Sequence, residues 1–144
     1  MCSIMGYRGK NSAAPILVNG LQRMEYRGYD SVGVATKSKN QILLRKGIGK
    51  VVEVNNAVQL DELPGNIGIG HTRWATHGKV TEKNAHPHPS NSGKIAIVHN
   101  GIIENFEELK SNLQKKGFDF HSETDTEVIA NLIQLNFDES PDIK

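Results

Sequence analysis

The second residue of the chain, Cys2, is its only cysteine and the first candidate for chemistry. Removal of Met1 leaves Cys2 with a thiol and a free α-amine on one residue. An unperturbed α-amine has a pKa of about 7.7–8.0, close to working pH, so it can accept the thiol proton directly or through water. An amino-terminal nucleophile of this kind needs no histidine partner. The alternative is an incidental cysteine beside the initiator methionine.

A second candidate is the segment 70–78, which reads Gly-His-Thr-Arg-Trp-Ala-Thr-His-Gly. The segment lies where an expected strand runs into a loop. It places four side chains there that are suited to binding a small molecule: Arg73, Trp74, Thr76 and His77. The guanidinium offers a planar fork of donors for a carboxylate, and the indole offers an apolar wall. The alternative is a surface arginine and a core tryptophan.

Two further segments can complete such a site. Asn100 and Gly101 directly follow an expected strand, so a side-chain amide and a backbone N–H can point to one place. Two such donors form an oxyanion hole for acyl transfer, although an ordinary Asn-Gly turn has the same sequence. Asp125 falls in the first turn of an expected helix, where a carboxylate is favoured in any case. It can also hold a substrate ammonium group.

The loop 86–89 contains two histidines separated by a proline, His86 and His88. A His-x-His pair can chelate zinc, but a zinc site needs a third ligand, and the only cysteine is distant in the sequence. We therefore expect no metal and no cofactor, and we interpret the segment as a loop stiffened by proline.

Composition narrows the class of protein. The 144 residues correspond to about one domain. Seventeen basic and sixteen acidic side chains leave a net charge of +1, so we expect no nucleic-acid partner. The longest aliphatic run, residues 95–98, is far shorter than the roughly 20 residues of a membrane span, so we expect no membrane partner. The single cysteine fits a reducing compartment, and we expect a cytoplasmic protein.

Short strands and helices that do not alternate regularly are expected to position these residues. Apolar runs predict strands over 3–7, 32–36, 42–45, 67–74 and 95–99, with an edge strand over 118–121. Helices are predicted from Ser12 to about 27, over 50–60 and 105–116, and from a capping box at 124–127 to about 137. Residues 75–94 are expected to form a long polar loop. The class is α+β with a mostly antiparallel sheet.

Taken together, these residues resemble the amino-terminal glutaminase domains of the glutamine–fructose-6-phosphate aminotransferase family. Those domains are class II glutamine amidotransferases of the Ntn-hydrolase superfamily. The resemblance rests on Cys2 and on the segments 21–33, 71–78, 84–88, 98–105 and 122–128, which follow the family order across almost the whole chain. Amidophosphoribosyltransferases and asparagine synthetases share the nucleophile and the Asn-Gly pair, but the strings Arg-Trp-Ala-Thr-His-Gly and Asn-Ala-His-Pro-His are typical of the aminotransferase branch.

The resemblance implies an αββα sandwich that hydrolyses L-glutamine. Cys2 would form a γ-glutamyl thioester, while Asn100 and Gly101 stabilise the oxyanion. The remaining implied roles concern substrate and partner: Arg73 with Thr76 and His77 for the α-carboxylate, Asp125 for the α-ammonium, Trp74 for a closing loop, Arg27 and Gly28 beside the nucleophile, and His86 facing a sugar-isomerase domain. That domain would bind fructose 6-phosphate and receive the ammonia, as a step in amino-sugar (UDP-N-acetylglucosamine) biosynthesis.

Two departures from the family pattern bear on this reading. Ser3 stands where the family usually has glycine after the nucleophile. The family's domain also runs well past Lys144, so we expect residues 1–144 to be a truncated glutamine amidotransferase domain, incomplete at its C-terminus and without the sugar-isomerase domains. The alternatives are a non-catalytic remnant of the same family and an amidotransferase domain that serves another acceptor.

Overall fold

The larger sheet of the protein comes from the first half of the chain. In the computed structural model, which describes residues 1–75 and 79–140, its strand order is β1-β4-β2-β3 and every neighbouring pair is antiparallel. Its strands are β1 (Ser3–Arg8), β2 (Ser31–Ser38), β3 (Gln41–Ile48) and β4 (Ile67–Arg73). The four strands predicted in this part of the sequence are therefore confirmed, each extended or shortened by a few residues.

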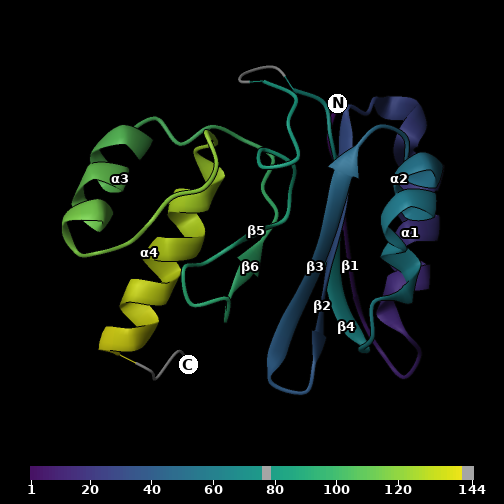
Figure 1. Cartoon of the computed structure of the whole chain (residues 1–144), viewed down its shortest axis with the longest axis horizontal. Helices are drawn as coiled ribbons and strands as arrows, with labels where there is room; N and C mark the ends of the chain where they lie inside the picture. The colour runs from purple at the N-terminus through teal and green to yellow at the C-terminus, as the bar shows by residue number, and fades with distance from the viewer. Residues whose placement is uncertain (76–78, 141–144) are drawn as a thin grey trace.

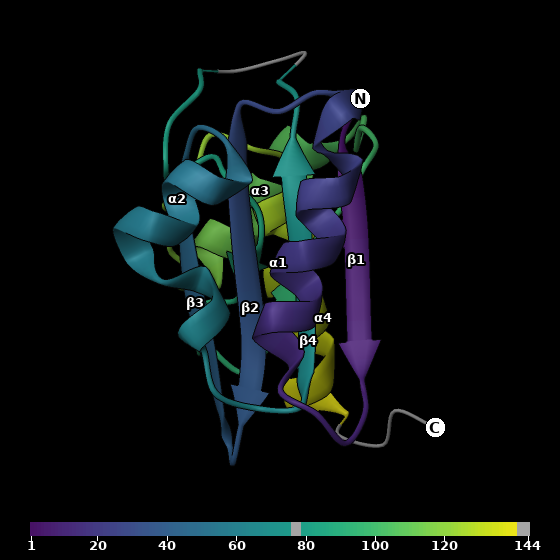
Figure 2. The same ribbon diagram turned by 90° about the vertical axis from the view of Figure 1, so that its right-hand side faces the viewer.

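Two helices cover one face of this sheet, as Figure 2 shows. They are α1 (Ala13–Met24), which continues into the 3-10 turn η1 (Glu25–Arg27), and α2 (Val51–Val58), followed by η2 (Leu60–Glu62). Both helices confirm the prediction. The core between helices and sheet consists of fully buried aliphatic side chains, among them Leu17, Leu21, Val32, Val34, Val51 and Leu60.

Strand alternation separates the two faces of the sheet. A Cβ on Gly68 or Gly70 would meet Leu17 or Leu21 of α1 at 2.8 Å, so the even positions of β4 face the helices. Because successive side chains of a strand point to opposite faces, His71 and Arg73 face away from α1 and α2.

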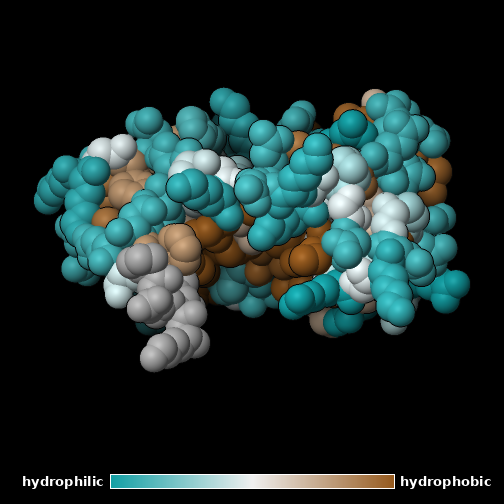
Figure 3. Space-filling view, turned by 90° about the horizontal axis from the view of Figure 1, so that it is seen from below, coloured by the Kyte–Doolittle hydropathy of each residue, from teal (hydrophilic) through white to brown (hydrophobic). Residues whose placement is uncertain are grey.

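The second half of the chain supplies the other sheet and helix layer (Figure 1). It contains two short antiparallel strands, β5 (His88–Pro89) and β6 (Ala96–Ile97), and two helices, α3 (Phe106–Lys115) and α4 (Thr126–Glu139). The layers follow one another as helix, sheet, sheet and helix, which is the expected αββα order. Figure 3 shows apolar side chains gathered on the lower side of the molecule, where the two sheets face each other. None of the helices in the described parts of the chain has the length and apolar character needed to cross a membrane.

Three predictions for the second half were wrong in detail. The strand expected over 95–99 has only two residues, and the expected loop 75–94 contains β5. The edge strand over 118–121 is absent, since side chains bind its backbone: the amide of Asp119 donates to Asn91 Oδ1 at 2.5 Å, and that of His121 donates to Glu127 at 2.9 Å.

The predicted capping box at 124–127 also differs from the structure. Asp125 is the N-cap of α4, and Thr124 makes no capping bond. The carboxylate of Glu127 reaches further back and accepts bonds from the backbone N–H of Ser122 at 2.7 Å and from its hydroxyl at 2.6 Å. The helix begins at Thr126, one residue later than a capping box with Thr124 as the N-cap predicts.

The two layers meet at Gly33, on the face of β2 that points toward the second sheet. A Cβ at this position would lie 2.1 Å from the carbonyl oxygen of His86 and 2.7 Å from Cβ of Lys46. Lys46 Nζ donates to the carbonyl oxygens of Ala85 at 2.6 Å and Pro87 at 3.3 Å. Burial lowers the pKa of Lys46 to about 8, against the opposing effect of nearby carboxylates. The segment 83–87 is thus held against the sheet through its backbone.

This close approach predicts the effect of adding one methyl group. G33A is expected to lower the free energy of unfolding by about 1–3 kcal/mol, because the new Cβ must displace backbone rather than a flexible side chain. The matched control is G6A in β1, where a Cβ would meet nothing within 4 Å. Its stability should be unchanged or slightly raised. Urea unfolding of both variants measures the difference, and equal stability of the two would contradict the proposed contact.

Candidate active site

A cavity of about 780 Å³ opens between the two layers, at the end of the sheet where the chain begins. The first layer contributes lining residues next to β1 and at the end of β4: Cys2, Arg27, His71, Arg73 and Trp74. The second layer contributes the loop after β6 and the start of α4: His99, Asn100, Gly101, Ile103, Thr124 and Asp125. Segments distant in the sequence therefore share one cavity.

Cys2 lies just before β1, on the side of the sheet that faces the cavity. Its half-buried Sγ accepts a hydrogen bond from the backbone N–H of Trp74 at 3.2 Å and lies 3.6 Å from the Trp74 carbonyl oxygen. The amine of Met1 donates to the carbonyl oxygen of Arg27 at 2.8 Å. While Met1 is attached, the nitrogen of Cys2 is an amide, so the proposed base exists only after Met1 is removed.

The neighbouring Ser3 does not line the cavity. It lies in β1 opposite Thr72, on the helix side of the sheet, and its side chain is 3% exposed with an Oγ that has no hydrogen-bond partner. Its φ lies outside the left-handed region, so this backbone does not need the conformational freedom of glycine. The hydroxyl therefore points away from the cavity that Cys2 faces.

Gly28 and Asp30 hold the cavity wall beside Cys2. Gly28 has φ +126°, and a Cβ there would lie 2.7 Å from the ring of Trp74 and 3.0 Å from the nitrogen of Met1. The backbone N–H of Asp30 donates to the carbonyl of Arg73 at 2.7 Å, and the Asp30 carboxylate accepts from the backbone N–H of Ala75. Sequence reasoning did not single out Asp30, which lies just before β2. It fixes the chain leaving β4.

The Asn-Gly turn is held by two histidines. Nε2 of His71 lies 2.7 Å from Oδ1 of Asn100. The ring of His99 lies against Gly101, where a Cβ would be 2.7 Å from the His99 Nε2. A Cβ at this position would therefore require the His99 ring to shift. The hydrogen bond to Oδ1 leaves the NH₂ of Asn100 available to the cavity.

Two opposite charges lie on opposite sides of the cavity. Arg73, the last residue of β4, is 7% exposed and donates from Nη1 to the carbonyl of Lys79 at 3.3 Å. Asp125, the N-cap of α4, accepts at Oδ2 from the backbone N–H of Ile103 at 2.7 Å. This bond ties the chain that follows Gly101 to the start of α4. A cation on one layer and an anion on the other are complementary to a zwitterionic amino acid.

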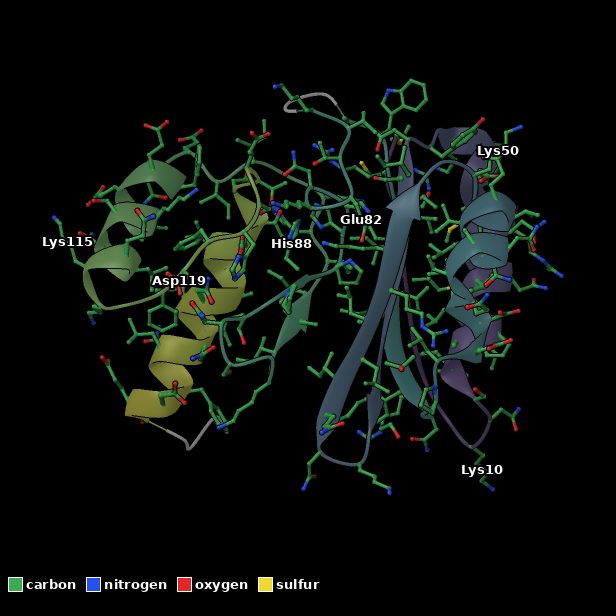
Figure 4. All side chains as sticks on the ribbon, viewed as in Figure 1. Lys10, Lys50, Glu82, His88, Lys115 and Asp119 are labelled. Atoms are coloured by element: carbon green, nitrogen blue, oxygen red, sulfur yellow. The ribbon has the colours of Figure 1, made fainter. Side chains whose placement is uncertain are left out.

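Three histidines form a buried stack at the cavity wall, which His71 and His86 line. The rings of His71 and His86 are stacked at 4.3 Å, and His86 meets His88 edge to face at 4.6 Å. Nε2 of His88 lies 3.0 Å from the Thr124 hydroxyl, and Figure 4 shows His88 on the inner side of α4. Burial is the main cause that lowers the pKa of His71 to about 4, that of His88 to about 3 and that of His86 further still. All three rings are neutral at pH 7.

The stack alters what was expected of this loop. The ring of His86 is 6% exposed, contacts the other two histidines and lines the cavity. Its role toward a sugar-isomerase domain stays a prediction. Within residues 1–75 and 79–140, no three histidine, cysteine or acidic side chains are grouped as ligands for a metal ion. The zinc alternative for His86 and His88 has no third ligand there.

The cavity unites most of the residues singled out from the sequence. Eight predicted residues line it: Cys2, Arg27, Arg73, Trp74, His86, Asn100, Gly101 and Asp125. Gly28 lies beside Trp74, whereas Thr76 and His77 fall outside the described residues. Sequence reasoning did not assign a role to His71, His99 and Thr124, which also line the cavity. Each belongs to a motif that was singled out, but no pattern in the sequence distinguished it from the other residues of that motif.

The buried histidines predict a loss of stability in acid. In the unfolded chain each ring takes up a proton near pH 6.5, whereas the folded state keeps the three rings neutral to about pH 4 or below. The free energy of unfolding should therefore fall from about pH 6.5 downward, by up to about 1.4 kcal/mol per pH unit for each ring. Urea unfolding at several pH values measures this slope.

The matched comparison is H88Q against H121Q. The ring of His88 is buried and its pKa is lowered, so H88Q should flatten the profile by about one proton. H121Q makes the same change at an exposed position and serves as the control for the substitution itself. Identical profiles for H88Q and the wild type would show that the His88 ring is not held neutral.

Comparison with known proteins places this arrangement in a family. Residues 56–138 match the family model described as a glutamine amidotransferase domain. The glutamine–fructose-6-phosphate aminotransferase [isomerizing] of Pyrococcus horikoshii is 58% identical over 136 residues, covering 94% of this chain and 23% of that protein. The protein of the same name from Bacteroides thetaiotaomicron is 57% identical over 135 residues, covering 93% and 22%. The chain spans less than a quarter of the length of these relatives.

Solved structures agree on the fold. A glutamine phosphoribosylpyrophosphate amidotransferase from B. subtilis, complexed with ADP and GMP, aligns with TM-score 0.76 and 31% identity, covering 93% of this chain and 29% of that one. A structure described as the allosteric regulatory enzyme of purine biosynthesis aligns with TM-score 0.79 at the same identity and coverage. The predicted Ntn-type α+β fold is confirmed. Since the family model covers more than half of the sequence, the chain belongs to the glutamine amidotransferase domain family.

Proposed function

We propose that this chain is the glutamine-hydrolysing part of a glutamine–fructose-6-phosphate aminotransferase. The observation that carries the proposal is the shared cavity, in which the Cys2 thiol, the Asn-Gly turn, Arg73 and Asp125 meet from two layers. The high identity to relatives with that name favours this acceptor over the one named for the structural neighbours, which are 31% identical.

Recognition of glutamine uses two of the charged side chains that line the cavity, Arg73 and Asp125. The guanidinium of Arg73 binds the α-carboxylate through its planar fork of donors. The carboxylate of Asp125 binds the α-ammonium, while its bond to Ile103 keeps it in place. Thr76 and His77 add polar contacts to the α-carboxylate in this proposal. The glutamine side chain then extends from these anchors toward Cys2.

The reaction proceeds in two steps at the amide carbon of the glutamine side chain. The α-amine of Cys2, exposed by removal of Met1, accepts the thiol proton, and Sγ attacks the carbon. The proton then passes to the amide nitrogen, the carbon–nitrogen bond breaks, and ammonia leaves a γ-glutamyl thioester. Water, deprotonated by the same amine, attacks the thioester and releases glutamate with the free thiol.

The oxyanion formed in each step lies between two donors. The side-chain NH₂ of Asn100 and the backbone N–H of Gly101 bind the negative oxygen more strongly than the neutral amide oxygen, and so lower the barrier. A donor of this kind contributes roughly 10²–10³-fold in rate. Arg27 and Gly28 position the nucleophile and the indole of Trp74 beside it.

The acceptor half lies in the part of the relatives that this chain does not cover. We propose that residues 1–144 form part of the amidotransferase domain and that a sugar-isomerase domain receives the ammonia. Trp74 is 50% exposed at the cavity and closes over glutamine, while His86 supports the segment that meets the isomerase domain. A reactive thiol of this kind needs a reducing environment, so we place the protein in the cytoplasm.

Covalent labelling tests the proposed nucleophile. Intact mass is measured before and after treatment with a diazoketone analogue of glutamine, and the single cysteine removes any need for site mapping. We expect a starting mass without methionine, one adduct per chain, and protection by excess glutamine. C2A should give no adduct. A processed chain that stays unlabelled would favour the non-catalytic remnant.

The carboxylate clamp predicts a separate kinetic effect. R73K keeps the positive charge but loses the bidentate fork, so KM for glutamine should rise about 10- to 100-fold with a smaller change in kcat. The matched control is R23K, an exposed position on α1, which should leave both constants unchanged. Assays of glutamate release measure both variants. An unchanged KM in R73K would remove Arg73 from glutamine binding.

A further inference from the structure

His71 contacts the Asn-Gly turn from the other layer of the molecule. It lies in β4, a central strand of the large sheet, where it is paired with Ile4 of β1 and Gly33 of β2. Asn100, by contrast, lies in a loop that follows β6 without regular secondary structure. The 2.7 Å contact between His71 Nε2 and Asn100 Oδ1 therefore joins a central strand to a loop.

The chemistry of the contact fixes which atom donates. An amide oxygen can only accept, so Nε2 of His71 must carry the proton and Nδ1 must be unprotonated. Nδ1 is buried and has no hydrogen-bond partner among the described residues, and burial keeps the ring neutral. The stacked ring of His86 restricts rotation of the His71 ring. One tautomer in one orientation thus faces Asn100.

The orientation of Asn100 matters because its amide has two faces of opposite polarity. The terminal torsion of an asparagine side chain is broad and roughly two-fold, so the side chain alone does not choose between them. With Oδ1 bound to His71, the NH₂ is the group presented to the cavity. With the amide reversed, an oxygen would face the oxyanion and repel it. Among the described residues, the bond from His71 is the hydrogen bond that holds this side chain.

We propose that His71 is a positioning residue that donates from Nε2 to Asn100 Oδ1 and thereby turns the Asn100 NH₂ toward the oxyanion. The inference rests on the proposed function and adds a residue that acts through Asn100 rather than on glutamine itself. Since the oxyanion exists only during the reaction, the loss of His71 should affect kcat far more than KM.

Steady-state glutamine hydrolysis by four variants tests this role. H71A should lower kcat about 10- to 100-fold and leave KM within about two-fold, because a misplaced donor loses most of its effect. H71Q retains an N–H donor at a similar reach and should recover much of the loss. The double variant H71A/N100A should be no slower than N100A, because both changes remove the same interaction.

A second measurement covers the case in which H71A does not fold. The ¹⁵N spectrum of the histidine side chains, with the His71 signal assigned from H71Q, should show the Nε2–H tautomer at pH 7. A protonated Nδ1 overturns the inference, as does H71A with unchanged kcat or additive loss in the double variant. A folded wild type without any glutaminase activity overturns the proposed function itself, and the inference with it.

Discussion

The approach of one backbone segment to another at Gly33 is the constraint on which the rest of the structure depends. The carbonyl of His86 occupies the space where any other residue would carry a Cβ, and Lys46 holds the carbonyls on either side. This contact sets the spacing of the two sheets. It also brings the histidines of the second layer against His71 of the first, so that the stack and the Asn-Gly turn follow from it.

Neutral histidines suit the proposed recognition of a zwitterion. Three buried rings that remain uncharged add no positive charge to the cavity, which Arg73 and Asp125 line from opposite layers together with Arg27, Glu104 and Glu123. Protonated rings beside Arg73 would add positive charge near the guanidinium and weaken the contrast between the two sides. Burial, rather than any single hydrogen-bond partner, keeps the three rings uncharged, because the low-dielectric interior disfavours the charged ring.

Periodic segments and chemical motifs were predictable from the sequence, whereas contacts between distant residues were not. The alternation of β2 and the apolar side of α1 were sufficient to predict these elements. The absent strand at 118–121 depended on Asn91 and Glu127, which no local pattern connects to it. Cys2 and Arg73 were found from their chemistry. His71 was read only as part of a string, since its burial and its contact with Asn100 depend on the packing of the layers.

The division of the cavity between two layers has a consequence for how the molecule responds to its ligand. Cys2 and Arg73 belong to one layer, and Asn100, Gly101 and Asp125 belong to the other. A molecule that binds Arg73 and Asp125 together connects the two layers. Its binding affinity and the stability of the packing between the layers are therefore thermodynamically linked. A free ligand concentration of a hundred times the dissociation constant adds about 2.7 kcal/mol to the free energy of unfolding. A substitution that weakens the packing between the two layers, even far from the cavity, should therefore also lower the affinity for the ligand.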